Sequence, residues 1–195
     1  MNYLAHLHLA ALAHEDPLYM VGGMMGDFVK GKLYLDYPQA LYAGIQLHRK
    51  IDRYTDEHAE VLRAKAYFQP PVRRFAGIAL DICFDHFLTK YWRQFSTVNL
   101  EDFSENAFDQ LEMHYALLPP ALQSALPRMR QHQILTSYGS LAGIDLALSR
   151  IAQRLTRGAP LLSATQVIEE NYGNIDRCFR SFYPDIIEWV SGREV

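Results

Sequence analysis

The chain has 195 residues, of which 49% are hydrophobic, and it carries a formal net charge of −3. This length suits one domain with a substantial core, and the apolar and aromatic content excludes a disordered protein. The negative charge argues against nucleic-acid binding through bulk charge. Two cysteines, Cys83 and Cys178, are too few for a disulfide framework and predict free thiols in a cytoplasmic protein. No apolar run reaches about 18 residues, so we expect a soluble protein without a membrane span.

The predicted elements are helical nearly throughout, because Leu, Ala, Arg, Gln and Glu dominate and alternating β-branched runs are absent. A first helix is expected from Asn2, as its N-cap, to about His14, and Asp16-Pro17 ends it. A glycine-rich segment over 21–31 follows.

Further helices are expected over 38–56, 57–68, 72–95, 100–117, 121–135, 139–156 and 164–190. Ser163 and Gln166 predict a capping box at the start of the last helix. The sequence therefore predicts an all-α fold in a single compact domain over 1–195.

The first cluster of polar residues contains His48 and Asp52, which lie about 40° apart on one helix face. Basic neighbours leave a solvated surface pair as the alternative. Asp27 lies in the glycine-rich segment between apolar residues. A contribution to solubility does not readily explain an acidic residue at that position. The alternative for Asp27 is an Asx turn or an N-cap.

The second cluster contains Asp81 and Asp85, which also share a face, on a helix of apolar composition. Two buried carboxylates repel each other, so we expect a metal ion or an arginine between them. Arg73 or Arg74 would supply the ion-pair alternative. Two such clusters facing each other can share a divalent cation.

The histidines near these clusters have open roles. His86 lies about 100° around the helix from Asp85, so it fits the edge of a site, as ligand or acid, or else the core. His6 and His8 diverge by about 200°, so at most one can face the site and the other is expected to face solvent.

Arginines recur at helical spacing later in the chain, at Arg150, Arg154 and Arg157. Such a stripe is typical of a solvated face, and it also suits docking to an acidic partner or a phosphate. Leu146, Ile151 and Leu155 occupy other positions of this helix and can face the core.

Taken in order, several segments resemble the acyl carrier protein phosphodiesterases, also called holo-acyl-carrier-protein hydrolases. The resemblance covers most of the chain and is densest over 1–95. The matching segments are 1–10, 26–31, 43–45, 48–52, 55–56, 80–81, 85–88 and 182–184.

The resemblance implies an all-α, HD-like metallohydrolase that removes the 4′-phosphopantetheine arm from the serine of holo-acyl carrier protein, typically with Mn²⁺. Carried over by position, it implies the site residues Asp27, His48, Asp52, Asp81, Asp85 and His86. The adjacent dyad reads Asp85-His86 here, in the reverse of the broader His-Asp pattern, which leaves the individual ligand roles open.

Our hypothesis places the cation, Mn²⁺ or else Mg²⁺, among five side chains, because carboxylate-rich ligation suits these ions. These ligands are Asp27, His48, Asp52, Asp81 and Asp85. His86 is the first choice as general acid for the leaving serine and His6 the second, while Arg49 would hold a phosphate oxygen.

Two other functions stay open at this point. One is an HD-like phosphohydrolase that acts on a nucleotide or another small phosphodiester. The other is a non-catalytic binding module whose acidic clusters are structural ion pairs. The main hypothesis expects holo-acyl carrier protein as the partner, with no nucleic acid and no membrane, and it leaves the oligomeric state open.

Overall fold

The computed structural model describes residues 1–31 and 37–192, and within these ranges the chain is helical, without a strand. The α-helices are α1 (Tyr3–Ala13), α2 (Pro17–Met25), α3 (Gln39–Glu57), α4 (Ala59–Lys65), α5 (Ala76–Phe95), α6 (Leu100–Met113), α7 (Pro120–Gln131), α8 (Leu141–Arg154), α9 (Ala164–Glu170) and α10 (Tyr172–Ser191). Four short 3₁₀ helices are η1 (Arg73–Phe75), η2 (Tyr115–Leu117), η3 (Ser137–Gly139) and η4 (Ala159–Ser163). The all-α prediction is confirmed, whereas the HD-like label stays a prediction.

The N-terminal helices differ from the prediction at Asp16-Pro17. The Asp16 side chain accepts a hydrogen bond from the Leu18 amide, and Pro17 occupies the first turn of α2. Both are signals for the start of a helix, so this dipeptide begins α2 as well as ending α1. The first part of the glycine-rich segment is consequently helical, up to Met25.

The C-terminal prediction of one helix over 164–190 is wrong, because the chain breaks at Asn171 into α9 and α10. The predicted capping box is also wrong. Ser163 belongs to η4 and makes no side-chain hydrogen bond to the first turn of α9, and the Gln166 amide donates to Glu170 instead.

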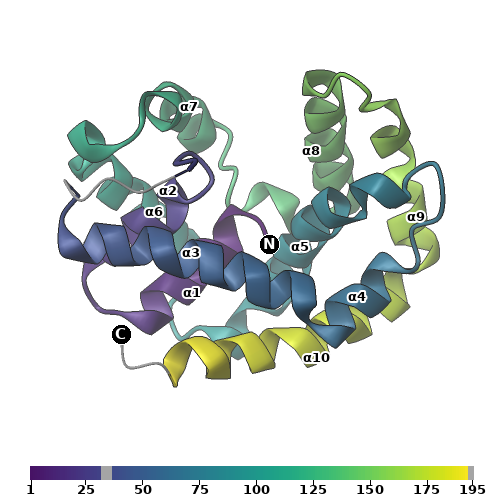
Figure 1. Ribbon diagram of the computed structural model, residues 1–195, viewed down its shortest axis with the longest axis horizontal. Coiled ribbons are helices and arrows are strands. Elements are labelled where there is room, and N and C mark those ends of the chain that lie inside the picture. The colour runs from purple at the N-terminus through teal and green to yellow at the C-terminus, as the bar shows by residue number, and fades with distance from the viewer. Residues whose placement is uncertain (32–36, 193–195) are drawn as a thin grey trace.

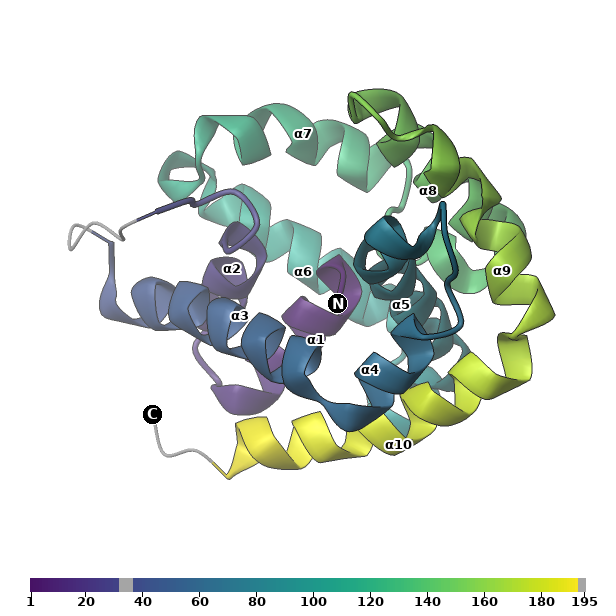
Figure 2. The ribbon, with the colours of Figure 1, turned by 45° about the vertical axis from the view of Figure 1, so that its right-hand side comes forward.

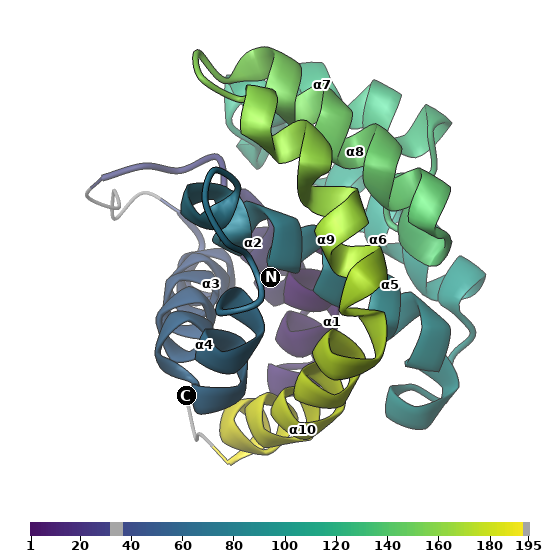
Figure 3. The same ribbon diagram turned by 90° about the vertical axis from the view of Figure 1, so that its right-hand side faces the viewer.

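Helix α1 lies at the centre of the molecule and contacts α2, α3, α5 and α10 (Figures 1, 2 and 3). It is buried continuously from Leu4 to Ala10. His8 is therefore buried too, with its Nδ1 2.9 Å from the Tyr183 hydroxyl and its Nε2 3.2 Å from the Phe95 carbonyl oxygen. The expectation that one of the two N-terminal histidines faces solvent is wrong, because the sequence does not reveal that α1 is covered on all sides.

Helices α2 and α3 pack with their backbones in direct contact. A Cβ atom added to Gly22 would overlap the Leu41 carbonyl oxygen, and one added to Gly44 would overlap the Tyr19 carbonyl oxygen. Glycine at both positions therefore permits an approach that side chains would prevent. No helix in the described ranges is both long enough and apolar enough to cross a bilayer.

Gly44→Ala is expected to lower the free energy of unfolding by about 1–3 kcal/mol, because the added methyl group forces α2 and α3 apart. Urea denaturation measures this loss. The matched control is Gly173→Ala in the first turn of α10, where an added Cβ meets no atom within 4 Å. The control should leave stability unchanged or raise it slightly. Equal stability of Gly44→Ala and the parent chain would contradict the close packing described here.

Candidate metal centre

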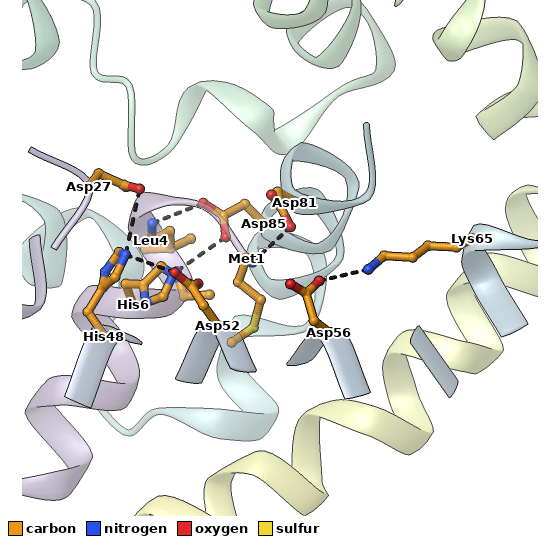
Figure 4. A network of polar contacts seen from close by, with 11 residues as sticks. Met1, Leu4, His6, Asp27, His48, Asp52, Asp56, Lys65, Asp81 and Asp85 are labelled. Atoms are coloured by element: carbon orange, nitrogen blue, oxygen red, sulfur yellow. Dashed lines mark hydrogen bonds and ion pairs between the residues drawn. The ribbon is translucent and has the colours of Figure 1, made fainter. Parts of the chain in front are cut away.

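Four polar side chains meet where α1, α2 and α3 come together (Figure 4). His6 comes from α1, His48 and Asp52 come from α3, and Asp27 follows the end of α2. The imidazole rings of His6 and His48 are buried and stacked, with their centroids 3.7 Å apart. The side chains of Asp27 and Asp52 are 44% and 47% exposed. The cluster therefore has a buried imidazole side and an open carboxylate side.

His48 is oriented by the backbone of α2. Its Nδ1 lies 2.8 Å from the Gly23 carbonyl oxygen, so Nδ1 carries the hydrogen and donates it. Its Nε2 then lies 3.3 Å from one Asp52 oxygen and 3.6 Å from one Asp27 oxygen. A bare lone pair facing two carboxylates is unfavourable, so this nitrogen requires a proton or a cation.

The protonation of His48 follows from these neighbours. Burial lowers its pKa, but the carboxylates of Asp27 and Asp52 that face Nε2–H outweigh burial and raise the pKa to about 9. The ring can lie here only because residue 26 is glycine, since an added Cβ on Gly26 would overlap the His48 side chain.

His6 carries two buried nitrogens without a hydrogen bond. Its Nε2 lies 3.1 Å from an Asp52 oxygen, but the direction does not suit a hydrogen bond, and neither ring nitrogen has a hydrogen-bond partner among the described residues. Burial, and then the positive charge of His48, lower the pKa of His6 to about 4. His6 is therefore neutral near pH 7 and offers an unused lone pair, which is an unusual state for a buried polar atom.

The potential ligand atoms of His6, His48 and Asp52 all lie within 4.8 Å of one another. Over residues 1–31 and 37–192, no other group of three histidine, cysteine or acidic side chains meets this condition. Two imidazole nitrogens with an adjacent carboxylate match the ligand preferences of divalent transition metals. The structure thus brings together three predicted ligands, His48, Asp52 and Asp27. His6, predicted as the second choice for general acid, lies with them.

Asp85 lies outside this group, because its carboxylate binds the first turn of α1. Its two oxygens accept hydrogen bonds from the Leu4 and Ala5 amides, at 2.9 and 3.2 Å. Burial is the largest effect on this carboxyl group and raises its pKa to about 7, against the opposing effect of those amides. Asp85 therefore caps the N-terminal end of α1.

Asp81 also has a different partner, the α-ammonium group of Met1 at 2.8 Å. The expected arginine does not lie between Asp81 and Asp85. Arg73 and Arg74 are both exposed, and Arg74 donates instead to the carbonyl oxygen of Arg157. The groups that compensate for these two carboxylates are backbone amides and an ammonium group, which the sequence pattern did not indicate. A role as metal ligands stays a prediction for Asp81 and Asp85, and these contacts do not support it.

His86 has partners at both ring nitrogens and lies outside the cluster. Its Nδ1 is 2.7 Å from the Tyr138 carbonyl oxygen and its Nε2 is 2.8 Å from the Tyr172 hydroxyl. Burial lowers its pKa. These contacts fit the alternative that His86 is a hydrogen-bonded histidine of the core. Its role as general acid stays a prediction.

Arg49 donates to the Val29 carbonyl oxygen at 2.9 Å and so ties the segment after Asp27 to α3. Its role in holding a phosphate oxygen stays a prediction. Gly23 and Gly26 were not predicted to position His48. The glycine-rich composition of this segment is the feature of the sequence that could have indicated it.

Comparison with known proteins places the chain in a family. A profile of the family described as acyl carrier protein phosphodiesterase matches residues 1–186. Proteins named acyl carrier protein phosphodiesterase from Serratia proteamaculans and Pectobacterium atrosepticum are each 35% identical over 196 residues, and both chains are covered completely. The protein of that name from Photorhabdus laumondii is 36% identical over 195 residues, which cover all of this chain and 97% of the relative. No solved structure matches the chain significantly. This full-length similarity shows that the chain belongs to the acyl carrier protein phosphodiesterase family.

Proposed function

We propose that this chain hydrolyses the phosphodiester that joins 4′-phosphopantetheine to a serine of holo-acyl carrier protein, releasing apo-acyl carrier protein. The family supports the substrate and the type of bond. The observation that carries the chemistry is the pair of buried nitrogens of His6, which make no hydrogen bond to the described residues and lie beside His48 and Asp52. Uncompensated polar atoms of this kind cost stability unless they bind a ligand.

The ion that fits these donors is a divalent cation, Mn²⁺ or else Mg²⁺. In the proposal His6, His48 and Asp52 hold it, and Asp27 supplies a fourth donor from the open side. When bound, such an ion would offset the negative charge of the phosphodiester and lower the pKa of water. The donor set fits, since His6 is neutral and the Nδ1–H of His48 is held by Gly23, as is typical of ligating histidines.

The chain's own residues orient these donors and admit the substrate. The half-exposed carboxylates of Asp27 and Asp52 open the cluster to solvent, while the histidines lie behind them. Hydrolysis adds water across the phosphorus–oxygen bond, so phosphorus gains the hydroxyl group and the serine oxygen gains the proton. In this proposal His86 has a structural role in the packing of α5 against α10, because both of its ring nitrogens already have protein partners.

A cytoplasmic location is part of the proposal. Cys83 and Cys178 are both buried free thiols, which suits a reducing compartment.

Incubation of holo-acyl carrier protein with this protein and Mn²⁺ should remove the mass of the phosphopantetheine arm, as measured by mass spectrometry. Asp52→Asn is expected to slow this reaction by about 100-fold or more, because it removes a proposed ligand that also contacts both histidines. Asp56→Asn is the matched control one turn further along α3. Asp56 is exposed and pairs with Lys65 instead of the cluster, so its rate should not change.

Retention of the arm in the presence of Mn²⁺ would contradict the proposed function. Equal turnover of a free phosphopantetheine ester would instead favour the small-phosphodiester alternative. If Asp52→Asn kept the parent rate at saturating Mn²⁺, the reaction would have to occur at another site.

Binding of Mn²⁺ should release a proton, because the ion must displace the one held on Nε2 of His48. The raised pKa of about 9 means that this proton is present at neutral pH. The apparent affinity for Mn²⁺ should therefore rise by about tenfold for each pH unit up to that pKa. Isothermal titration calorimetry in buffers of different ionisation enthalpy counts the released proton. Affinity that does not change between about pH 7 and pH 8 would show that His48 is not a ligand.

A further inference from the structure

Several exposed arginines form no ion pair in the described part of the chain, and five of these lie in η1 and in or just after α8. We call Arg73, Arg74, Arg150, Arg154 and Arg157 the arginine patch. None of them forms an ion pair with a carboxylate in the described part of the chain. Arg130 shows the contrasting arrangement, because it forms ion pairs with three acidic side chains, those of Glu105, Asp109 and Glu112.

The patch joins two segments that are distant in the sequence. Arg74, in η1 just before α5, donates from its guanidinium group to the carbonyl oxygen of Arg157, just after α8, at 2.6 Å. Helices α5 and α8 are in contact and lie next to each other in Figures 1 and 2. The arginine stripe of α8 therefore continues across to the start of α5.

The exposed face of α8 also carries apolar side chains. Leu146 is 51% exposed and Leu155 is 37% exposed, so the expectation that they face the core is wrong, whereas Ile151 packs against the core as expected. Leu146 lies one helical turn before Arg150, on the same face as the stripe. This face thus combines like charges at i, i+4 spacing, which repel each other, with an exposed leucine.

Tyr3, at the start of α1, interacts electrostatically with Arg154 of the patch and with Asp27 of the histidine–aspartate cluster, which comprises His6, Asp27, His48 and Asp52. Burial, and then the negative charge of Asp27, raise the pKa of Tyr3 to about 12, and the positive charge of Arg154 opposes this rise. Tyr3 also stacks on Phe28, the residue after Asp27, with ring centroids 6.3 Å apart. Arg150 acts in the same way on Tyr138. The first turn of α1 therefore relates the arginines of α8 to the open carboxylate side of the cluster through Tyr3.

We propose that the arginine patch, together with Leu146, docks an acidic surface of the protein substrate beside the histidine–aspartate cluster. This inference rests on the proposed function, which requires a macromolecular substrate with its reactive serine near Asp27 and Asp52. Unpaired arginines would attract an acidic protein and speed its association. An acidic protein fits better than a nucleic acid, because the remainder of this chain is negatively charged and Leu146 offers an apolar contact.

The test is charge reversal of Arg150 and Arg154 together, to glutamate, in the full chain. The Michaelis constant for holo-acyl carrier protein at low salt should rise by about tenfold or more, with kcat unchanged. Its dependence on ionic strength should become flatter, since screening acts on the attraction that was removed. The matched control is Arg93→Glu, which changes an exposed arginine at the opposite end of α5 and should leave both quantities unaltered. Circular dichroism verifies that both variants fold.

A binding measurement separates this inference from the proposed function. Apo-acyl carrier protein has no phosphodiester, so its affinity, measured by fluorescence anisotropy, tests docking alone and should also fall in the double variant. Failure of the parent chain to hydrolyse holo-acyl carrier protein would contradict the function and leave this docking test in place. An unchanged Michaelis constant and unchanged apo-protein affinity would overturn the docking surface. Loss of duplex DNA binding, with carrier-protein binding unaltered, would also overturn it and assign the patch to nucleic acid.

Discussion

The close contact between α2 and α3 is the constraint on which the histidine–aspartate cluster depends. Gly22 and Gly44 let the two backbones touch, and Gly26 leaves space for the ring of His48. The same contact brings the Gly23 carbonyl within hydrogen-bonding distance of His48 Nδ1. Glycines on α2 therefore determine which nitrogen of His48 faces the carboxylates. Side chains at these positions would move α3, and the cluster would lose its geometry.

Charge compensation explains why four ionisable groups can share this space. In the absence of a cation, a proton on His48 compensates for Asp27 and Asp52, and burial, together with the positive charge of His48, keeps His6 neutral. A divalent cation would replace that proton and use the free nitrogen of His6 as well. Asp85 contributes indirectly, because its bonds to the first turn of α1 hold the helix that carries His6.

Local sequence patterns predicted the helices and the association of His48 with Asp52, because both depend on spacing within one element. Asp27 was also identified correctly as a neighbour of this pair, from its glycine-rich surroundings. The roles of Asp85 and His86 were not predictable in the same way. Their partners are backbone amides, a carbonyl and a tyrosine from distant segments, which periodicity cannot reveal. The break at Asn171 likewise interrupts an apolar pattern that continues through it.

The central claim is that the cation binds between α1 and α3, and not at the acidic pair on α5. Anomalous X-ray diffraction from crystals soaked in Mn²⁺ tests this most directly, because it locates the ion independently of catalytic activity. The account predicts an anomalous peak within coordination distance of Nε2 of His48, a ring nitrogen of His6 and a carboxylate oxygen of Asp52. A peak between Asp81 and Asp85, or the absence of a peak at the histidines in fully soaked crystals, would contradict it.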